Sequence, residues 1–319
     1  MLKRPGDKMA HFIYPLIQSI WEEEAIPKAW NVGQITSIWK GRGDKESLTN
    51  HRGITISSSI GSIVETLIYN RIEAHVPFTQ AQGGGKRGAS TCDHLFILRA
   101  TIDISKQDKK ETYITFFDVS KAYDNADNND MLDTIWNGGL QGKSWRILRN
   151  MNKDLKATVK TKHGLTREFE MEIGGRQGSK NTGCLFSKTM DRLAERLLST
   201  EIGFRLTSYI QIPVLLWVDD VVSLIEGKED QRKMLQHIDQ FAKDHKIRWG
   251  QEKCRVMRVG KHTKGEVETW KIGDLQMLET ATYQYLGDII SNDGKNAKNI
   301  EARKNKIDAS SLNQNDRCK

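Results

Sequence analysis

Apolar segments that run directly into aspartates constrain the fold of this chain most strongly. Val214–Trp217 and Val221–Ile225 are apolar, and the short stretch between them contains Asp219-Asp220. Two apolar runs broken by a polar pair predict a β-hairpin. A third apolar run, Thr112–Phe117, predicts a strand that leads straight into Asp118. A strand of this kind buries both faces, so an acid at its end must be paired, hydrated or bound to a metal ion.

The adjacent carboxylates of Asp219 and Asp220 repel each other. Burying them without compensation costs roughly several kcal/mol per charge. A divalent cation relieves this cost, and Mg²⁺ is typically held by one or two carboxylates together with the phosphates of a substrate. The alternative is an ordinary polar turn, because Asp is common in turns. These residues alone leave both interpretations open.

The rest of the chain mixes helical and strand patterns irregularly. Apolar residues recur at helical spacings in four segments, 9–30, 60–76, 91–106 and 230–243. Strand patterns cover 34–39, 255–259 and 283–290. A Gly-rich basic segment at 82–91 contains a predicted flexible loop. Strands that interleave irregularly with helices favour an α+β fold over a doubly wound parallel sheet.

The charge balance favours a polyanionic partner. The 319 residues include 49 Lys and Arg against 41 Asp and Glu, a formal net charge of +8, and each phosphate that a cation neutralises releases a counterion. Within 142–167, where Asp154 is the single acid, cation spacings of three and four predict a basic helical segment. The alternative is an ordinary solvated helix face.

Two further patterns bear on the location of the protein. The apolar runs are far shorter than the roughly 18 residues that a membrane span needs, so we expect no membrane association. The four cysteines are widely scattered, as is typical of a protein in a reducing compartment. We therefore expect an intracellular location, with nucleus and cytoplasm both left open.

Several short segments form an ordered set of motifs. Phe116–Asp124, Gly174–Gly178 and Leu216–Asp220 follow one another along the chain. Further motif-like segments are found at 26–30, 50–54, 82–91, 252–254 and 285–287. In this order they resemble the motifs of reverse transcriptases from non-LTR (LINE-type) retrotransposons. The resemblance covers nearly the whole chain.

The resemblance implies an architecture. It predicts the fingers and palm of a right-hand polymerase, with fingers at 1–111 and a palm at 112–294. The palm would contain a ferredoxin-like antiparallel sheet backed by helices. Residues 295–319 would be the start of a thumb connection or a disordered tail, so the thumb is expected to be largely absent. The thumb and an endonuclease are expected elsewhere in a parent polyprotein.

The resemblance also implies an activity. A reverse transcriptase is an RNA-directed DNA polymerase, which extends a primer 3′-hydroxyl with dNTPs on an RNA template. Two Mg²⁺ ions, for which Mn²⁺ is a possible substitute, would serve the reaction. Asp118, Asp219 and Asp220 are the implied metal ligands and catalytic residues. The implied partners are the RNA template, the DNA primer and dNTPs.

Other motif positions acquire roles in the same way. Lys253 is an implied catalytic proton donor to pyrophosphate, and Tyr123 is an implied steric gate against ribonucleotides. The remaining implied site residues bind the nucleotide (Lys40, Arg52, Arg176, Gln177 and Gly178) or form the primer grip (Tyr285, Leu286 and Gly287).

Departures from the family pattern keep a second hypothesis open. Trp217 replaces the usual Tyr or Phe, Gly53 replaces a proline, and the chain has five prolines in all. A truncated or degenerate, non-catalytic nucleic-acid-binding remnant would account for these changes. A viral RNA polymerase is disfavoured because Tyr123 would exclude ribose. An intron-encoded maturase would be expected to carry an additional C-terminal RNA-binding domain.

Overall fold

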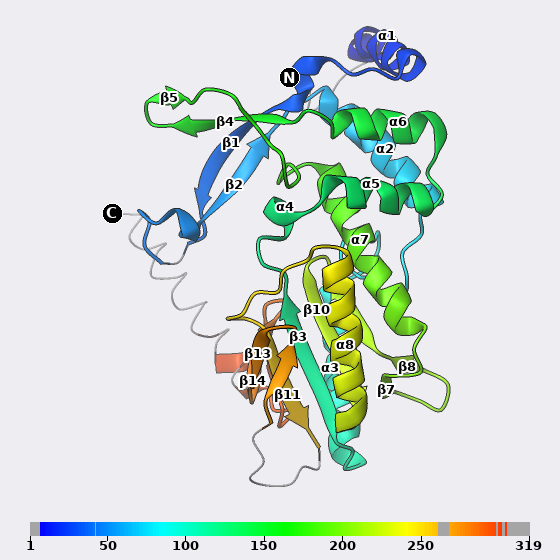
Figure 1. Cartoon of the computed structure of the whole chain (residues 1–319), viewed down its shortest axis with the longest axis vertical. Coiled ribbons are helices and arrows are strands. Elements are labelled where there is room, and N and C mark those ends of the chain that lie inside the picture. The colour runs from blue at the N-terminus through cyan, green and yellow to red at the C-terminus, as the bar shows by residue number, and fades with distance from the viewer. Residues whose placement is uncertain (1–6, 42, 261–267, 298, 302–303, 305–319) are drawn as a thin grey trace. The chain divides into compact units, whose positions relative to one another are not determined.

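The computed structural model describes residues 7–41, 43–260, 268–297, 299–301 and 304 (Figure 1). The chain divides into two compact units, each assembled from three segments. The first unit comprises 1–79, 120–192 and 244–248, and the second comprises 80–119, 193–243 and 249–319. The predicted fingers and palm ranges of the sequence stay predictions, and most of 295–319 lies outside the described residues.

A five-stranded sheet forms one part of the first unit. Its strands are β1 (Val32–Trp39), β2 (His51–Ile56), β4 (Lys156–Thr161), β5 (Gly164–Leu165) and β6 (Phe169–Glu170). β1 pairs antiparallel with β2 and parallel with β4, which also pairs with β5 and β6. Short 3₁₀ turns precede β1 and β2 at Lys28–Asn31 and Leu48–Asn50. The strand predicted at 34–39 is therefore confirmed within β1.

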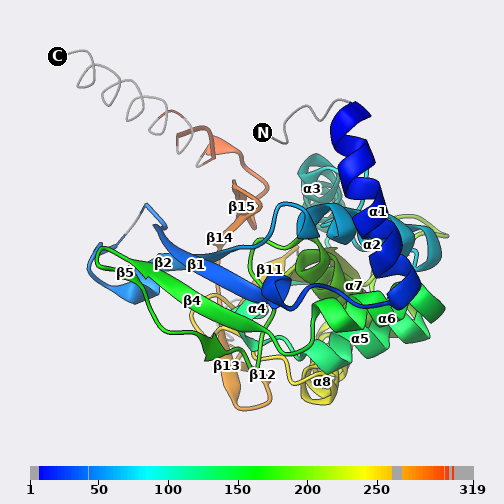
Figure 2. The same cartoon turned by 90° about the horizontal axis from the view of Figure 1, so that it is seen from above.

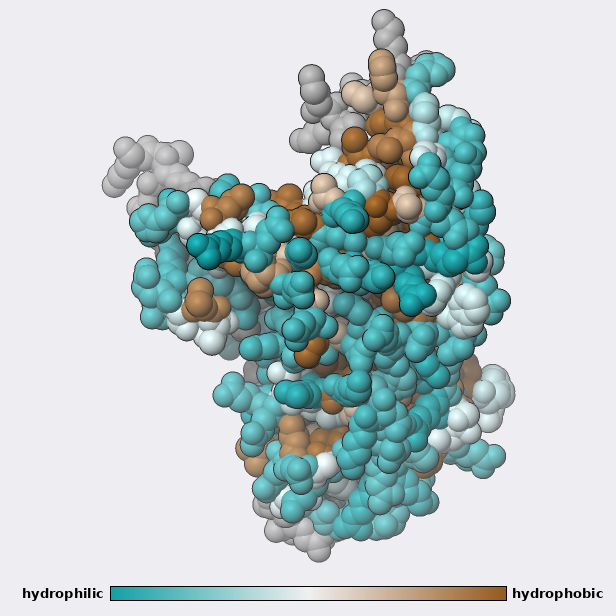
Figure 3. All heavy atoms as spheres, turned by 45° about the horizontal axis from the view of Figure 1, so that its top comes forward, coloured by the Kyte–Doolittle hydropathy of each residue, from teal (hydrophilic) through white to brown (hydrophobic). Residues whose placement is uncertain are grey.

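Helices make up the rest of the first unit. They are α1 (Asp7–Glu23), α2 (Gly61–His75), α4 (Ala122–Asn125), α5 (Asn128–Asn137), α6 (Gly142–Met151) and most of α7 (Lys180–Leu198). The helix predicted at 9–30 was too long, because α1 ends at Glu23, before Glu24 adopts a φ of 56°. Figure 3 shows apolar side chains gathered over α1, where Phe12 is 82% exposed. α1 thus leaves apolar surface open to solvent.

The charge spacing of the basic segment 142–167 predicts a helix, but the structure does not form one helix there. α6 ends at Met151, and Asp154 takes a φ of 51° before the chain enters β4. Lys156–Thr161 carries the β-branched residues Thr158, Val159 and Thr161, which favour a pleated strand over a helix. The cations at spacings of three and four thus lie partly on α6 and partly on β4.

A six-stranded sheet forms the centre of the second unit. In spatial order its strands are β12 (Trp270–Ile272), β13 (Leu275–Glu279), β11 (Arg255–Val259), β3 (Thr112–Asp118), β10 (Asp220–Glu226) and β9 (Val214–Trp217). Each of the four strands from β11 to β9 is antiparallel to its neighbours within this group. Along the chain, α7 lies between β3 and β9, and α8 (Lys228–Asp244) lies between β10 and β11. Two helices alternating with strands in the order 4-1-3-2 give the predicted ferredoxin-like palm sheet.

Helices cover both faces of this central sheet. α3 (Thr91–Gln107) lies on one face and α8 on the other (Figures 1 and 2). Strand alternation explains the division, since Thr115 accepts a hydrogen bond from Gln231 of α8, while its neighbours Ile114 and Phe116 belong to the core beneath α3. The sheet is consequently buried on both sides, as its apolar strands predicted.

Two small hairpins complete the second unit. β14 (Thr282–Tyr285) pairs with β15 (Asp288–Ser291), and β7 (Phe204–Arg205) pairs with β8 (Gln211–Ile212). The single strand pattern at 283–290 is therefore a hairpin that turns at Leu286-Gly287. Among the described residues, no helix is long and apolar enough to span a membrane.

The Gly-rich segment is more ordered than the sequence predicted. Gln82 is only 1% exposed and forms a parallel bridge with Leu216 of β9. Gly83 donates its backbone N–H to the Leu216 carbonyl at 2.9 Å, and Leu216 donates to the Ala81 carbonyl at 2.9 Å. Residues 81–84 therefore extend the edge of the central sheet. The expectation of a flexible loop is wrong for this part of 82–91.

Candidate active site

Two aspartates face each other on the central strands of the second unit. Asp118 ends β3, Asp220 begins β10, and the two are register partners in the antiparallel ladder. Side chains at paired positions project from the same face of a sheet, so both carboxylates lie on the face that carries Phe116 and Val222. Asp219 precedes Asp220 in the turn between β9 and β10. The sequence thus folds its three acids to one end of one sheet.

Negative charge accumulates at this end of the sheet. Burial, together with the charges of Asp219 and Asp118, raises the pKa of Asp220 to about 6. Lys253 opposes this shift, and its Nζ lies 2.7 Å from Asp118 Oδ1. The Lys253 side chain remains more than half exposed. One exposed ammonium therefore compensates the carboxylates only in part.

Gly250 allows the segment carrying Lys253 to approach Asp118. Its backbone N–H donates to the Asp118 carbonyl at 2.7 Å, and a Cβ at this position would lie 2.9 Å from Asp118 Oδ2. A larger residue would push the carboxylate aside. The sequence reasoning missed Gly250, although a glycine just before the 252–254 motif is a signal of close backbone approach.

The aspartates suit a magnesium ion that is shared with a substrate. Within the described part of the chain, no group of three or more His, Cys, Asp and Glu side chains is present that could hold a metal ion. Asp118 and Asp220 nevertheless supply hard carboxylate oxygens from paired positions. Mg²⁺ commonly uses only one or two protein carboxylates and completes its coordination with phosphate oxygens and water. The donor chemistry fits that mode of binding.

The turn before Asp219 is held in an unusual conformation. Val218 has a φ of 60°, a region that β-branched residues rarely adopt. Gln82 Oε1 accepts hydrogen bonds from Gly84 N at 2.9 Å and from Val218 N at 3.3 Å. A Cβ on Gly84 would lie 2.8 Å from the Trp217 carbonyl carbon. The edge segment 81–84 therefore supports the turn at Trp217–Asp220, the aspartate turn, directly. The sequence reasoning did not assign this role to it.

The predicted primer-grip residues form the turn of the β14–β15 hairpin. Leu286 and Gly287 have φ values of 46° and 89°, as a two-residue type I′ turn requires. Tyr285 is 2% exposed, and burial raises its pKa. Tyr283 stacks on Phe116 with ring centroids 4.0 Å apart, and the charges of Asp118 and Asp220 add to the burial that raises the pKa of Tyr283. The hairpin therefore lies on the same sheet face as the aspartates.

The remaining predicted site residues belong to the first unit. The Gln177 carbonyl accepts a hydrogen bond from Thr55 N of β2 at 2.8 Å. Gly178 has a φ of 112°, and a Cβ there would lie 3.3 Å from the Thr55 carbonyl oxygen. The glycine therefore lets the loop pass close to β2. Arg52 is three residues from Thr55 along this strand, a distance of about 10 Å, and is exposed.

Tyr123 lies on the other side of the same loop. Its carbonyl accepts a hydrogen bond from Gly175 N at 2.9 Å, and its ring lies 5.7 Å from that of Phe186. A Cβ at Gly174 would lie 2.8 Å from the Tyr123 carbonyl oxygen. The glycines at 174 and 175 thus bring the Gln177 loop against Tyr123.

Arg176 and Lys40, two of the predicted nucleotide-binding cations, do not lie beside the Gln177 loop as exposed side chains. Arg176 is 5% exposed and donates to the carbonyls of Trp30 at 2.8 Å and Met151 at 2.9 Å. Burial lowers the pKa of Arg176, and the charge of Glu65 partly offsets this shift. Because its contacts are the Trp30 and Met151 carbonyls and Glu65, the guanidinium connects segments within the first unit. Lys40 donates to the Thr49 carbonyl at 2.8 Å, just beyond the end of β1. It lies five residues beyond the Thr55 partner Ile35, about 17 Å along the strand.

The family can be assigned once this geometry is compared with known proteins. Residues 43–290 match the family described as reverse transcriptase (RNA-dependent DNA polymerase). The match covers most of the chain, and this chain belongs to that family. The α+β fold with a ferredoxin-like sheet agrees with the fingers and palm of a reverse transcriptase.

The chain is also similar to polyproteins of retrotransposable elements. The chain is 28% identical over 201 residues to the Pol polyprotein of a type-1 retrotransposable element R2 from Popillia japonica, covering 62% of this chain and 28% of that protein. It is 24% identical over 252 residues to the R2 polyprotein of Nasonia vitripennis, covering 76% of this chain and 24% of that protein. The chain thus spans about a quarter of the length of these relatives.

Solved structures show the same fold at low sequence identity. A structure of apo telomerase from Candida tropicalis, truncated from its C-terminal domain, matches with a TM-score of 0.54 at 14% identity. This match covers 89% of the present chain and 59% of the telomerase chain. A telomerase from Candida albicans in complex with a fragment of telomeric RNA matches with a TM-score of 0.51 at 12% identity, covering 90% and 50% of the two chains.

Proposed function

We propose that this chain is the polymerase part of a non-LTR retrotransposon protein and extends a primer 3′-hydroxyl with dNTPs on an RNA template. The observation that carries the proposal is the pairing of Asp118 with Asp220 beside Asp219. These acids share one end of a buried sheet in a chain that belongs to the reverse transcriptase family. The basic composition suits a nucleic-acid substrate.

The proposed mechanism assigns each group a task. Asp118, Asp219 and Asp220 would hold two Mg²⁺ ions, for which Mn²⁺ is a possible substitute. When bound, the ions activate the primer hydroxyl and stabilise the charge on the leaving oxygens. Lys253 Nζ donates a hydrogen bond to Asp118 Oδ1, and Lys253 is proposed to donate a proton to pyrophosphate. The buried sheet fixes the positions of the carboxylates, which favours catalysis by orientation.

Residues of the first unit would select the nucleotide. Tyr123 is the proposed gate, because its ring is fixed beside Phe186 and would crowd a ribose 2′-hydroxyl. Gln177 and Gly178 are proposed to line the nucleotide pocket, and Arg52 and Lys40 to contact phosphates. Arg176 is better supported as an internal brace of this loop, because carbonyls of Trp30 and Met151 occupy its guanidinium.

A primer-extension assay tests the proposal. Purified wild-type protein, a primed RNA template, Mg²⁺ and dNTPs should give extended product. The Asp219→Ala/Asp220→Ala protein should lose at least about a thousandfold in rate, or about 4 kcal/mol of activation free energy. A matched control, Glu229→Ala/Asp230→Ala, removes two charges from the first turn of α8 in the same unit and should extend normally.

Other outcomes have definite meanings. No extension by the wild type, with primer–template binding retained, would favour the non-catalytic nucleic-acid-binding remnant. Equal extension by the wild type and the Asp219→Ala/Asp220→Ala protein would show that the active site lies elsewhere or that a contaminating polymerase is present. Loss of activity in the Glu229→Ala/Asp230→Ala control would point to general instability rather than to a metal site.

A further inference from the structure

A buried histidine contacts both the β9–β10 hairpin, which carries Asp219 and Asp220, and the β14–β15 hairpin, which carries the predicted primer grip. His94 is in the first turn of α3 and is 4% exposed. Its ring packs edge-on against Trp217, with centroids 5.5 Å apart and an interplanar angle of 85°. Its Nδ1 lies 3.3 Å from Tyr285 Oη, within hydrogen-bond distance, with the donor set by the imidazole tautomer. One side chain thus contacts both hairpins.

Each contact adjoins a turn with a proposed function. Trp217 is the last residue of β9 and pairs with Asp220 across the Val218-Asp219 turn. Tyr285 is the last residue of β14 and pairs with Asp288 across the Leu286-Gly287 turn. The imidazole therefore lies next to the residue that starts each turn.

Gly83 leaves the space that this arrangement needs. A Cβ on Gly83 would lie 2.7 Å from His94 Nε2 and 2.9 Å from the Trp217 ring. The edge segment 81–84 therefore closes over the histidine and the tryptophan without a side chain at that point. Such tight packing leaves the imidazole little freedom to move.

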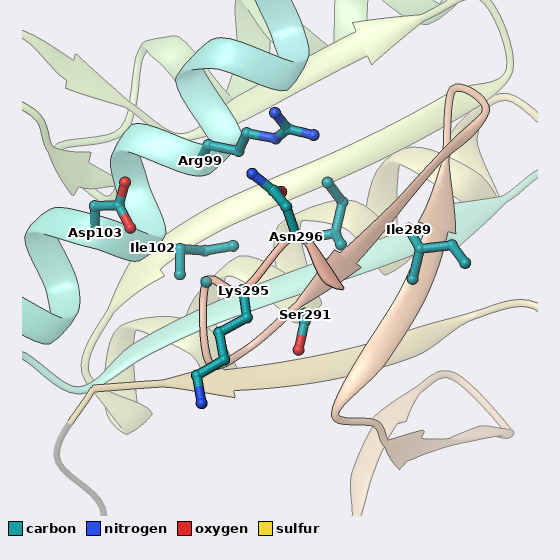
Figure 4. A pocket seen from close by; sticks show the side chains of 9 residues that line it. Arg99, Ile102, Asp103, Ile289, Ser291, Lys295 and Asn296 are labelled. Carbon is teal, nitrogen blue, oxygen red and sulfur yellow. The ribbon is translucent and has the colours of Figure 1, made fainter. Parts of the chain in front are cut away.

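Other residues of α3 also pack against these hairpins, and the core cluster that contains Ile102 includes Val222 of the β9–β10 hairpin. Arg99 forms an ion pair with Asp288 at 2.6 Å, and Ile102 and Ile290 belong to the same core cluster. Figure 4 shows Arg99, Ile102 and Asp103 projecting from α3 beside the β15 hairpin, where they line a small pocket. His94 contacts Trp217 and Tyr285, the residues that start the two turns.

We propose that His94 is a positioning residue that fixes the aspartate turn (Trp217–Asp220) relative to the grip turn (Tyr285–Asp288). Its edge contact sets the position of the Trp217 indole, and its Nδ1 sets that of the Tyr285 phenol. A primer end held by the grip turn would then be aligned with the carboxylates. The effect on extension rests on the proposed function, whereas the coupling between the turns is measurable without any activity.

Amide hydrogen exchange tests the coupling itself. Tyr285→Phe removes only the hydroxyl that meets His94, and we expect exchange to become about tenfold faster at residues 284–288 and also at 216–220, as local opening spreads between coupled elements. In a His94→Phe background, which keeps an aromatic ring beside Trp217, adding Tyr285→Phe should cause no further change at 216–220. His237→Asn on α8 is the matched control and should change neither segment.

Two exchange results would overturn the coupling. Faster exchange confined to 284–288 in Tyr285→Phe would show that the turns move independently. An effect at 216–220 that persists in full when His94 is already phenylalanine would show that another route connects them. His94→Asn, which retains a polar nitrogen near the Nδ1 position, guards against misfolding and should keep exchange at 284–288 close to that of the wild type.

Primer extension tests the positioning role. We expect His94→Phe to lower kcat about tenfold while KM for dNTP changes less than about threefold, because alignment of the primer end changes and nucleotide binding does not. His94→Asn should recover part of the rate. An inactive wild type would refute the proposed function and leave the exchange result to decide the coupling. A full rate in His94→Phe with an active wild type would overturn the positioning role.

Discussion

The β9–β10 and β14–β15 hairpins of the second unit share a sequence pattern but differ in how the charges of their acids are compensated. Trp217-Val-Asp-Asp220 and Tyr285-Leu-Gly-Asp288 each place an aromatic residue before a two-residue turn and an aspartate after it. Asp288 meets the guanidinium of Arg99 at 2.6 Å. Asp220 instead lies among Asp219 and Asp118, and its pKa is raised to about 6. The acid of one hairpin is paired with an arginine, whereas the charge around Asp220 is compensated only in part by Lys253.

The backbone of the two turns also differs, since one turn is relaxed and the other is strained. The 286–287 turn has positive φ at both positions and has glycine at the second, which suits a type I′ turn. The 218–219 turn places a β-branched valine at a φ of 60°, where strain costs roughly 1–3 kcal/mol. Incompletely compensated charge and backbone strain therefore coincide at the aspartate turn. Such coincidence is expected where a site is shaped for binding rather than for stability.

Exchanging the acid for its amide in each hairpin should give opposite results. We expect Asp220→Asn to lower the extension rate at least about a thousandfold without lowering the free energy of unfolding in metal-free buffer, because the amide removes repulsion. Asp288→Asn should instead lower the free energy of unfolding by about 1–3 kcal/mol and keep extension within about tenfold. Urea titration and primer extension of both proteins give the comparison. Similar losses of rate in both variants would remove the distinction between the hairpins.

The histidine between the hairpins should make stability depend on pH. Burial, opposed by the charge of Asp93, lowers the pKa of His94 to about 4 from 6.5. The unfolded chain therefore binds a proton first as pH falls, and the contribution of the neutral imidazole is complete above pH 6.5 and declines toward pH 4. We expect the wild type to lose roughly 3 kcal/mol more stability than His94→Asn over this range.

Urea unfolding at pH 7 and pH 4.5 measures this difference. Carboxylates elsewhere titrate in both proteins, so the comparison between wild type and variant cancels their contribution. His237→Asn, on α8, should follow the wild-type dependence. Parallel pH curves for the wild type and His94→Asn would mean that the imidazole is not held neutral by its surroundings.

Sequence patterns predicted the parts of this molecule that have a strong periodicity. The strand at 255–259 coincides with β11, and the helices at 60–76 and 91–106 match α2 and α3 to within a residue or so. They also predicted that an apolar strand leads into Asp118 and that a β-hairpin carries Asp219-Asp220 between its apolar runs, and the structure has both features. In each case one apolar face or run determines both the local structure and the burial.

Elements with polar or mixed patterns were missed. α7 begins at Lys180 and continues through Asn181, Thr182 and Gly183, three poor helix formers. Its buried face includes Asn181, Ser187 and Thr189. The second half of α7 does carry buried apolar residues at spacings of three and four, namely Phe186, Met190, Leu193 and Leu197, a helical signal that the prediction did not use. The roles of His94 and Gln82 could not be predicted either, because they depend on contacts with residues more than a hundred positions away.

A methyl group on Gly84 should disturb the aspartate turn without touching the grip turn. A Cβ there would collide with backbone atoms of Trp217 and Val218, which cannot move as a flexible side chain would. We expect Gly84→Ala to lower the free energy of unfolding by about 2 kcal/mol and to slow extension at least about tenfold. Gly88→Ala is the control in the same loop, because a Cβ there has no neighbour within 4 Å. Its φ of 82° should cost only about 1 kcal/mol. Equal effects would show that the loop does not support the turn.

Replacing the strained valine with glycine should separate stability from activity at the aspartate turn. Glycine adopts a φ of 60° freely, so relief of strain offsets the loss of a half-buried side chain. We expect Val218→Gly to change the free energy of unfolding by less than about 1 kcal/mol and to slow extension several-fold, because the turn is no longer held in one conformation. Leu286→Gly is the matched change in the grip turn. It relieves less strain, because leucine is not β-branched, and it removes a side chain packed on the core, so it should be the more destabilising of the two. A loss of more than about 2 kcal/mol in the free energy of unfolding of Val218→Gly would contradict this expectation. It would mean that packing of the valine side chain outweighs the strain of its backbone conformation.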